Sequence, residues 1–129
     1  MSHKSRISVV CIDCKTDDLT EATAFWSAML GKKAEPDEEG KYVAFDGHTG
    51  HPKVLLQAVD HEPRVHLDIE TDDKEAECAR LKGLGATEVA RLENWIVMEA
   101  PTGHRFCLVG PQGEDWPGDA TEFGGGTGG

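Results

Sequence analysis

The sequence predicts an α+β fold in which two βαβββ modules form a curved, half-open mixed sheet barrel with the helices outside. The first observation is an internal repeat. Residues 10–18, VCIDCKTDD, return 55 positions later as residues 65–73, VHLDIETDD, with five of nine residues identical. The second is that each copy leads into a helical pattern ending in Leu-Gly, at Leu30-Gly31 and Leu84-Gly85. Because duplicated modules place equivalent residues around a shared site, we expect the functional site where the two copies face each other.

The first module is expected over residues 7–59. A strand over residues 7–14 precedes a helix whose apolar side chains recur at helical spacing, namely Ala22, Phe25, Trp26, Met29 and Leu30. Asp18 and Glu21 match a capping box at the start of that helix. Strand-like runs at residues 32–35, 42–45 and 53–59 follow, separated by turns that contain Gly and Pro.

The second module is expected over residues 64–109, after a hinge at residues 60–63. A strand over residues 64–70 leads to a helix over residues 73–84, and the residues expected to face inward are Ala76, Ala79, Leu81 and Leu84. Three further strands are expected over residues 87–92, 95–99 and 104–109. The order of elements therefore repeats that of the first module.

Length and composition limit the class of protein. A chain of 129 residues with a mass of 14.0 kDa forms one domain, expected over residues 1–110. Six of the 15 glycines fall in residues 118–129, so residues 111–129 are predicted to be a flexible tail. The net charge of -11 argues against nucleic acid and anionic membranes as partners. It indicates either a solubilising surface or attraction of a cationic ligand.

The N-terminus is polar and precedes only a strand-length apolar run, so neither a signal peptide nor a membrane span is predicted and the chain is expected to be cytoplasmic. Its four cysteines fit reduced thiols in that compartment. Cys11 and Cys14 form a C-x-x-C sequence. Residues three apart in a strand point to opposite faces, so this pair is not expected to share a metal or a disulfide.

Strand alternation separates core from site. On residues 64–70, Val65, Leu67 and Ile69 are expected under the helix. His66, Asp68 and Glu70 are expected on the opposite face. The same division in the first copy places Val10, Ile12 and Cys14 in the core. The predicted ligand pocket on the concave face comprises Cys11, Asp13, Gln57, His66, Asp68 and Cys107.

The paired modules resemble the vicinal oxygen chelate superfamily, and most closely its glyoxalase-like members, relatives of bleomycin-resistance proteins. The resemblance is carried by residues 17–19 with the pattern Phe25-Trp26-x3-Leu30-Gly31, by the strand His66-Leu67-Asp68, and by the ending PTGHRFCLV at residues 101–109. It covers residues 7–109. It implies the fold and a homodimer but leaves the reaction open, because this superfamily includes isomerases, dioxygenases, antibiotic-modifying enzymes and plain binders.

The resemblance also implies where a metal would lie. Metal-dependent members take their ligands from the first and last strands of each module, which here carry Cys11, Gln57, His66 and Cys107. Only His66 is the residue type expected at its place. A glyoxalase would carry a glutamate near the last-strand position, and an extradiol dioxygenase would need two histidines and a carboxylate. Glyoxalase turnover and bound Ni, Fe or Mg are therefore not expected.

The functional expectation is a protein that binds a small polar organic molecule without a metal, with catalytic residues unknown. One alternative is a metal-dependent lyase, isomerase or dioxygenase in which one divalent metal such as zinc is held by Cys11, Gln57, His66 and Cys107. Another is a scaffold whose concave face is occluded and whose surface mediates self-association. Candidates for a second metal cluster are His48, His51, His61 and His104, although histidines in turns at such spacing are more often solvated. Open strand edges also favour a homodimer.

Overall fold

The structure is a computed structural model that describes residues 2–45, 52–111 and 115–124. The described residues contain nine strands and two helices and divide into two compact units. The first unit comprises residues 9–66, and the second comprises residues 1–8 together with residues 67–129. Strands β1 (His3–Lys15) and β5 (Arg64–Thr71) each contribute residues to both units.

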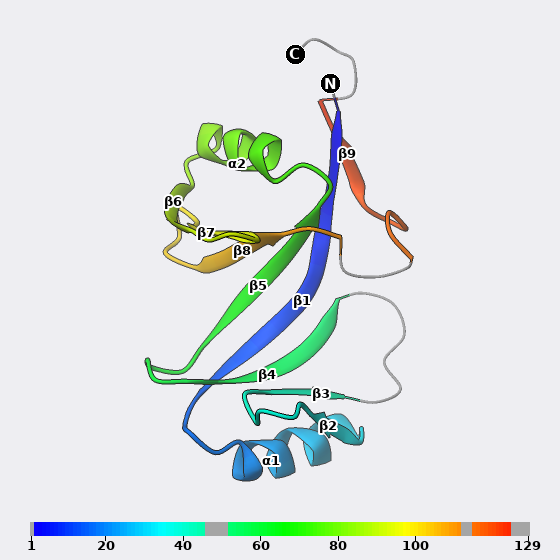
Figure 1. Cartoon of the computed structure of the whole chain (residues 1–129), viewed down its shortest axis with the longest axis vertical. Helices are drawn as coiled ribbons and strands as arrows, with labels where there is room; N and C mark the ends of the chain where they lie inside the picture. The colour runs from blue at the N-terminus through cyan, green and yellow to red at the C-terminus, as the bar shows by residue number, and fades with distance from the viewer. Residues whose placement is uncertain (1, 46–51, 112–114, 125–129) are drawn as a thin grey trace. The chain divides into compact units, whose positions relative to one another are not determined.

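The first unit follows the predicted order of elements. After β1 come α1 (Thr20–Leu30), β2 (Ala34–Pro36), β3 (Tyr42–Phe45) and β4 (Lys53–Val59). Strand β4 pairs in parallel with β1, and β3 and β2 add antiparallel strands in the order β2-β3-β4-β1 (Figure 1). Leu19, Val43, Phe45 and Leu56 form the buried centre of its apolar core. Helix α1 packs Ala22, Trp26 and Leu30 against that core.

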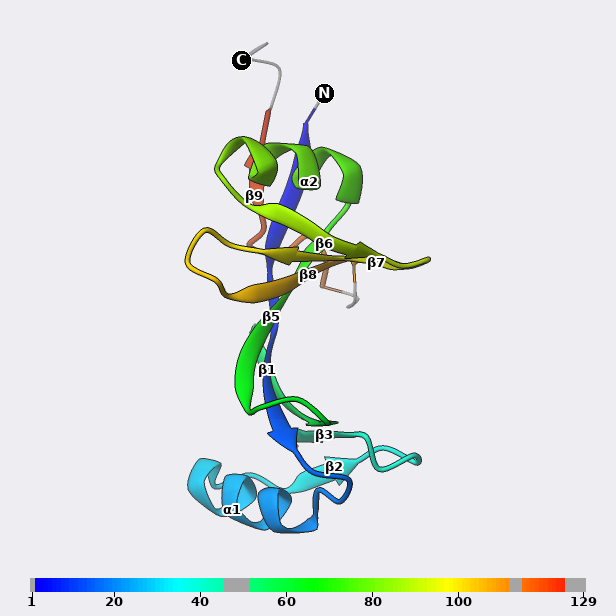
Figure 2. The same cartoon turned by 90° about the vertical axis from the view of Figure 1, so that its left-hand side faces the viewer.

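The second unit repeats this plan. After β5 come α2 (Lys74–Gly83), β6 (Thr87–Arg91), β7 (Trp95–Glu99) and β8 (Arg105–Val109). Strand β8 pairs in parallel with β5, while β7 and β6 continue antiparallel, and α2 lies next to these strands (Figure 2). Its buried core consists of Cys78, Ala86, Ile96, Met98 and Leu108. The predicted α+β class, the mixed strand directions and the repeated βαβββ order are confirmed.

The strand registers of the two units are equivalent. Asp13 lies opposite Gln57 in the first unit, and Asp68 lies opposite Cys107 in the second. Cys14 packs with the apolar cluster under α1, while Cys11 lies on the other face of β1 with Asp13. Burial raises the pKa of the Cys14 thiol, and the negative charge of Asp13 raises it further. The two thiols of the C-x-x-C sequence therefore face different environments, as predicted.

Several residues predicted to be in the core are exposed. Phe25 and Met29 on α1 are 60% and 55% exposed, because the helix contacts the sheet through a stripe with a spacing of four residues. Val65 and Leu84 are 49% and 67% exposed. Ala79 on α2 is also exposed. Glu77 and Cys78 take the buried positions of α2, because hydrogen-bonding partners from β1 meet Glu77 there.

The predicted capping box at the start of α1 is wrong. The N-cap position is Leu19, and no side chain caps this helix. The Asp18 carboxylate instead accepts hydrogen bonds from the backbone N–H and the hydroxyl of Thr20, at 2.9 and 2.7 Å. Asp18 thus stabilises a local turn that lies just before the helix.

The C-terminal segment differs from the flexible tail expected over residues 111–129. Strand β9 (Thr121–Phe123) pairs antiparallel with the start of β1, at His3–Ser5 (Figure 1). The Arg6 guanidinium donates to Asp115 and to Asp119, each at 3.0 Å. The number of glycines in this segment does not reveal such ion pairs, because they depend on an arginine more than 100 residues away in the sequence. Among the described residues, no helix is long and apolar enough to span a membrane.

Candidate functional site

A cluster of polar side chains lies in the first unit, on the face of β1 opposite its apolar core. Strand β1 contributes Cys11 and Asp13, β4 contributes Gln57, and β5 contributes His66. Cys11 and Asp13 are only 2% and 3% exposed. Burial of polar groups is unfavourable unless they are hydrogen-bonded, so their partners decide how this cluster is built. We call these four residues the polar cluster.

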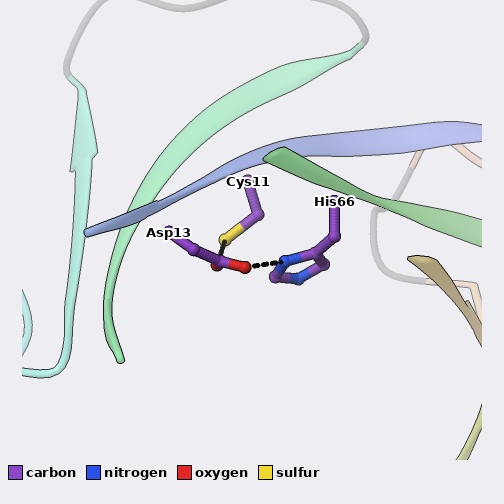
Figure 3. Close-up of side chains that lie close together, drawn as sticks. All are labelled: Cys11, Asp13 and His66. Atoms are coloured by element: carbon purple, nitrogen blue, oxygen red, sulfur yellow. Dashed lines mark hydrogen bonds and ion pairs between the residues drawn. The ribbon is translucent and has the colours of Figure 1, made fainter. Parts of the chain in front are cut away.

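The Asp13–His66 pair is at the centre of the cluster. The imidazole Nδ1 of His66 lies 2.9 Å from Oδ2 of Asp13, and the two side chains point toward one another (Figure 3). An ionised carboxylate can only accept, so Nδ1 carries the hydrogen and donates it. In the neutral ring, Nε2 then holds the lone pair. A carboxylate that fixes the tautomer and orientation of an imidazole is a common arrangement in binding and catalytic sites.

Cys11 and Gln57 complete the cluster. The Cys11 Sγ lies 3.7 Å from Oδ1 of Asp13 and 3.6 Å from Oε1 of Gln57, within reach of hydrogen bonds from the thiol. The Gln57 amide nitrogen donates to the hydroxyl of Tyr42 at 3.2 Å. The cluster is therefore a connected network that runs from β3 across β4 and β1 to β5.

Two further residues that the sequence did not identify as pocket residues are His61, in the hinge between β4 and β5, and Arg64, the first residue of β5. His61 Nε2 is 3.7 Å and Arg64 Nε is 3.9 Å from Oδ2 of Asp13. From the sequence, His61 is a candidate only for a second metal cluster. Because His61 lies in a hinge, where strand alternation does not apply, the sequence gives no direction for its side chain. Arg64 stands two positions before His66 on the same strand, so alternation places these two side chains on one face.

An open hollow of about 640 Å³ adjoins the cluster. Gln57 and His61 line it, together with Lys15, Thr16, Asp17, Ala58, Val59 and Asp60. A volume of this size is within the range of small-molecule sites, and its lining mixes apolar with polar atoms as such sites do. Gln57, a member of the cluster, and His61, which lies 3.7 Å from Asp13, thus also line a space that a small molecule could occupy.

Asp68 and Cys107, the other two predicted pocket residues, belong to the second unit. They lie opposite one another on β5 and β8, as Asp13 and Gln57 do on β1 and β4. The Ser8 hydroxyl donates to the backbone carbonyl of Asp68 at 3.3 Å. The structure therefore brings Cys11, Asp13, Gln57 and His66 together, and it places Asp68 and Cys107 opposite one another on β5 and β8.

The donor atoms of the cluster suit a transition metal. The Sγ of Cys11, a carboxylate oxygen of Asp13 and a ring nitrogen of His66 all lie within 4.8 Å of one another. Zinc accepts sulfur, nitrogen and oxygen ligands in a tetrahedral arrangement, in which sulfur and oxygen ligands are about 3.5 Å apart. The observed 3.7 Å from Sγ to Oδ1 fits that spacing. These three donors differ from the metal ligands predicted from the sequence, because they include Asp13. A thiolate ligand favours zinc over manganese or magnesium.

The remaining histidines do not extend the cluster within the part of the chain that the structure describes. His104 in the second unit shares a hydrogen bond of 2.8 Å with the Thr102 hydroxyl. His48 and His51 lie outside the described residues. The second metal cluster considered from the sequence therefore gains no support from His61 or His104.

Comparison with known proteins identifies the domain. The family described as Glyoxalase-like domain matches residues 9–109, which cover both copies of the repeat. No curated protein matches the chain in sequence. The family match ends before β9, so the C-terminal segment lies outside it.

Solved structures of similar fold agree with this family. A Mn(II)-bound glyoxalase from Novosphingobium aromaticivorans is 20% identical with a TM-score of 0.61, over 85% of this chain and 40% of that one. A 2,3-dioxygenase from a Pseudomonas species is 20% identical with a TM-score of 0.56, over 84% of this chain and 41% of that one. A hypothetical protein from Bacillus halodurans is 12% identical with a TM-score of 0.57, over 85% and 96%. The chain thus spans about two fifths of the length of the glyoxalase and the dioxygenase.

Proposed function

The chain belongs to the glyoxalase-like domain family, and from this premise we propose that it binds a small polar organic molecule at the polar cluster of the first unit. The observation that carries the proposal is the buried Asp13–His66 pair, which Cys11 connects to Gln57 at the lining of a hollow of about 640 Å³. A buried carboxylate adds less to stability than an apolar side chain of similar volume, so a buried polar network beside an open space favours a role in binding. This proposal requires no metal.

In this arrangement Asp13 holds the imidazole of His66 in one orientation through its Nδ1–H. Gln57 and Tyr42 supply amide and hydroxyl groups that can exchange hydrogen bonds with a ligand. His66 itself is half-buried, with 17% of its side chain exposed, which allows contact with a ligand while limiting water. Polar groups placed in this way fix the orientation of a small molecule rather than supply most of its affinity.

Thermal denaturation in the presence of a panel of small polar compounds tests the proposal. A compound that binds only the folded chain raises its melting temperature. We expect His66→Ala to abolish that rise and His104→Ala, an exposed histidine of the second unit, to preserve it. A rise that survives His66→Ala and Asp13→Asn would place the ligand elsewhere and contradict the proposal.

A second candidate function is metal-dependent chemistry at the same place, favoured by the three donor atoms within 4.8 Å. Cys11, Asp13 and His66 would hold the ion, most suitably zinc, and Gln57 would lie beside it. Such a site supplies Lewis-acid polarisation of a ligand oxygen. The Mn(II)-bound glyoxalase of similar fold is a precedent for metal in this fold, and the thiol of Cys11 argues for a softer ion here.

Elemental analysis of protein purified without chelators separates the two candidates. One equivalent of zinc that is lost in Cys11→Ser and in His66→Ala supports the metal-dependent function. A chain that carries no metal, takes up none from added zinc, and still binds a compound in a His66-dependent manner supports the first proposal alone.

A further inference from the structure

Residues 115–124, called segment 115–124 below, follow the family match and contact the second unit mainly through polar groups. No residue of this segment, all of which the structure describes, is buried. It nevertheless contacts side chains that are almost fully buried. The side chain of Arg6 is 7% exposed, and His3 and Ser5 are 7% and 6% exposed. A segment that buries little apolar surface of its own opens at a lower free-energy cost than the core strands do.

Arg6 is the first group that segment 115–124 contacts. Its Nη2 donates to Asp115 and its Nη1 to Asp119, each at 3.0 Å, while its Nε donates to Glu70. The Trp116 ring lies over the same guanidinium, with the ring centroid 5.5 Å from Cζ. Buried donors need hydrogen-bond partners, and those to carboxylates are among the stronger ones. The segment therefore provides partners for two donors of an arginine that is almost fully buried.

Gly118 allows the segment to approach this guanidinium closely. Its φ of +46° lies in the left-handed region, which residues with a side chain rarely adopt. A Cβ at this position would lie 2.5 Å from Nη1 of Arg6 and 3.0 Å from the carbonyl oxygen of Asp115. Gly103 also has a positive φ, of +89°, but a Cβ there would meet no atom within 4 Å. Glycine is therefore required at position 118 by a contact with Arg6 as well as by the backbone.

Strand β9 adds a second set of contacts, at the first residues of β1. Residues 121–123 pair antiparallel with His3–Ser5. The centroid of the Phe123 ring lies 5.9 Å from that of the His3 ring and 3.6 Å from Cζ of Arg80. Extended peptides dock on the edge of a sheet in the same way, through backbone pairing along a strand together with a few side chains held in place.

We propose that residues 3–6 and Arg80 form a docking surface for an extended acidic peptide, and that segment 115–124 is such a peptide, docked in cis. The segment detaches as a unit while the rest of the chain stays folded, which leaves the surface open to the same peptide in trans. The recognised side chains are two aspartates four positions apart and an aromatic residue four positions further, namely Asp115, Asp119 and Phe123. The inference involves no residue of the polar cluster and does not depend on the proposed function.

Hydrogen exchange of the full chain tests whether the segment detaches by itself. We expect Gly118→Ala to speed exchange of the amides of residues 121–123 about tenfold, because the added Cβ separates the segment from Arg6. The amides of β7, in the core of the second unit, should exchange as before. Gly103→Ala is the matched control, since it places alanine at a positive φ without a clash. It should leave exchange at residues 121–123 unchanged.

The double variant Asp115→Asn with Asp119→Asn loosens the segment without altering the backbone. The two aspartate side chains are 53% and 80% exposed, so loss of both ion pairs should speed exchange at residues 121–123 only about fivefold. Glu122→Gln removes one exposed charge from β9 and should have no such effect.

A synthetic peptide with the sequence of residues 115–124 tests recognition in trans. We expect it to bind the Gly118→Ala chain and to shift the NMR signals of residues 3–6 and of Arg80. Its binding to the unaltered chain should be at least about tenfold weaker, because the tethered segment has an effective concentration in roughly the millimolar range and occupies the surface. Peptides that carry Phe123→Ala, or asparagine in place of both aspartates, should bind about tenfold more weakly than the unaltered peptide.

Three results would overturn the inference. In the first, exchange in Gly118→Ala rises in β7 as much as at residues 121–123, which would make the segment an integral part of the fold. In the second, the peptide does not bind the Gly118→Ala chain. In the third, it binds equally well without its phenylalanine or without both aspartates. If Gly118→Ala does not fold, exchange and peptide binding in the double aspartate variant decide between these outcomes.

Discussion

At the scale of single residues, Arg6 illustrates how burial sets the worth of an ion pair. Its guanidinium contacts the fully buried Glu70 and the exposed Asp115 and Asp119, whose side chains are 53% and 80% exposed. Burial lowers the pKa of Arg6, but the hydrogen bonds to these three carboxylates raise it by more. The ion pairs of Arg6 are therefore expected to contribute very different amounts to the free energy of unfolding.

We expect Arg6→Ala to lower the free energy of unfolding by about 3–5 kcal/mol, because it leaves the buried Glu70 carboxylate without its guanidinium. Asp119→Asn should cost only about 0.5 kcal/mol, since that pair is exposed. Urea denaturation of the two variants measures the difference. Glu122→Gln, another exposed carboxylate on the same segment, is the control for loss of charge. Equal costs for Arg6→Ala and Asp119→Asn would contradict this account.

Glu77 gives a prediction about pH. Burial raises its pKa, but hydrogen bonds from Arg80, His3 and Ser5 lower it by more, so the pKa lies below its usual range in the folded chain. A carboxylate with a depressed folded-state pKa stabilises the fold above its unfolded pKa and loses that effect as pH falls through the folded value. At neutral pH, Glu77→Gln should cost about 2–4 kcal/mol.

The same comparison repeated at decreasing pH checks the sign. The difference in stability between the chain and Glu77→Gln should shrink as the pH falls below the usual range of glutamate, where the carboxylate becomes protonated. Glu93→Gln, an exposed carboxylate on a turn, should show no such trend. If the difference in stability between the chain and Glu77→Gln grew at low pH, the ionised Glu77 carboxylate would not be what stabilises this region.

At the scale of elements, the two helices differ in how they begin. The side chain of Asp73 accepts a hydrogen bond from the backbone N–H of Ala76 at 3.0 Å and so caps α2, whereas α1 has no side-chain cap. Asp73→Ala should therefore destabilise the chain by about 1 kcal/mol, and Asp73→Ser should recover most of that loss. Denaturation followed by circular dichroism provides the measurement. If serine proves no better than alanine, the contribution of Asp73 is not that of a cap.

At the scale of the whole molecule, the homodimer remains a prediction. Strand β6 pairs only with β7 among the described strands, and the exposed Val89, Leu92 and Trp95 lie on or next to it. Open edges with apolar side chains are commonly covered by a second chain. Light scattering should give twice 14.0 kDa for the chain.

Val89→Lys is expected to shift that mass toward 14.0 kDa, because a buried lysine opposes association. Met29→Lys places the same charge on another exposed apolar residue, on α1, and should leave the mass unchanged. A mass of 14.0 kDa for the unaltered chain would contradict the dimer prediction. A dimer that persists in Val89→Lys would show that the interface does not involve β6.

The regular part of the fold could be predicted because it is encoded locally. The repeat at residues 10–18 and 65–73 set the order of elements, and strand alternation placed Cys11 and Cys14 on opposite faces of β1. The repeat can be read directly from the sequence, and strand alternation follows from backbone geometry, since side chains alternate along a strand whatever surrounds it. The positions of Gln57 and His66 in the polar cluster follow from the same rule.

Tertiary structure decided what periodicity does not encode. Phe25 and Met29 have helical spacing but are exposed, because the width of the buried stripe depends on the sheet that α1 meets. Asp115 and Asp119 look like part of a solvated tail until Arg6 binds them. His61 acquires its relation to Asp13 only from the path of the hinge. Interactions between residues distant in sequence, or carried on loops without a period, exist only once the chain is folded.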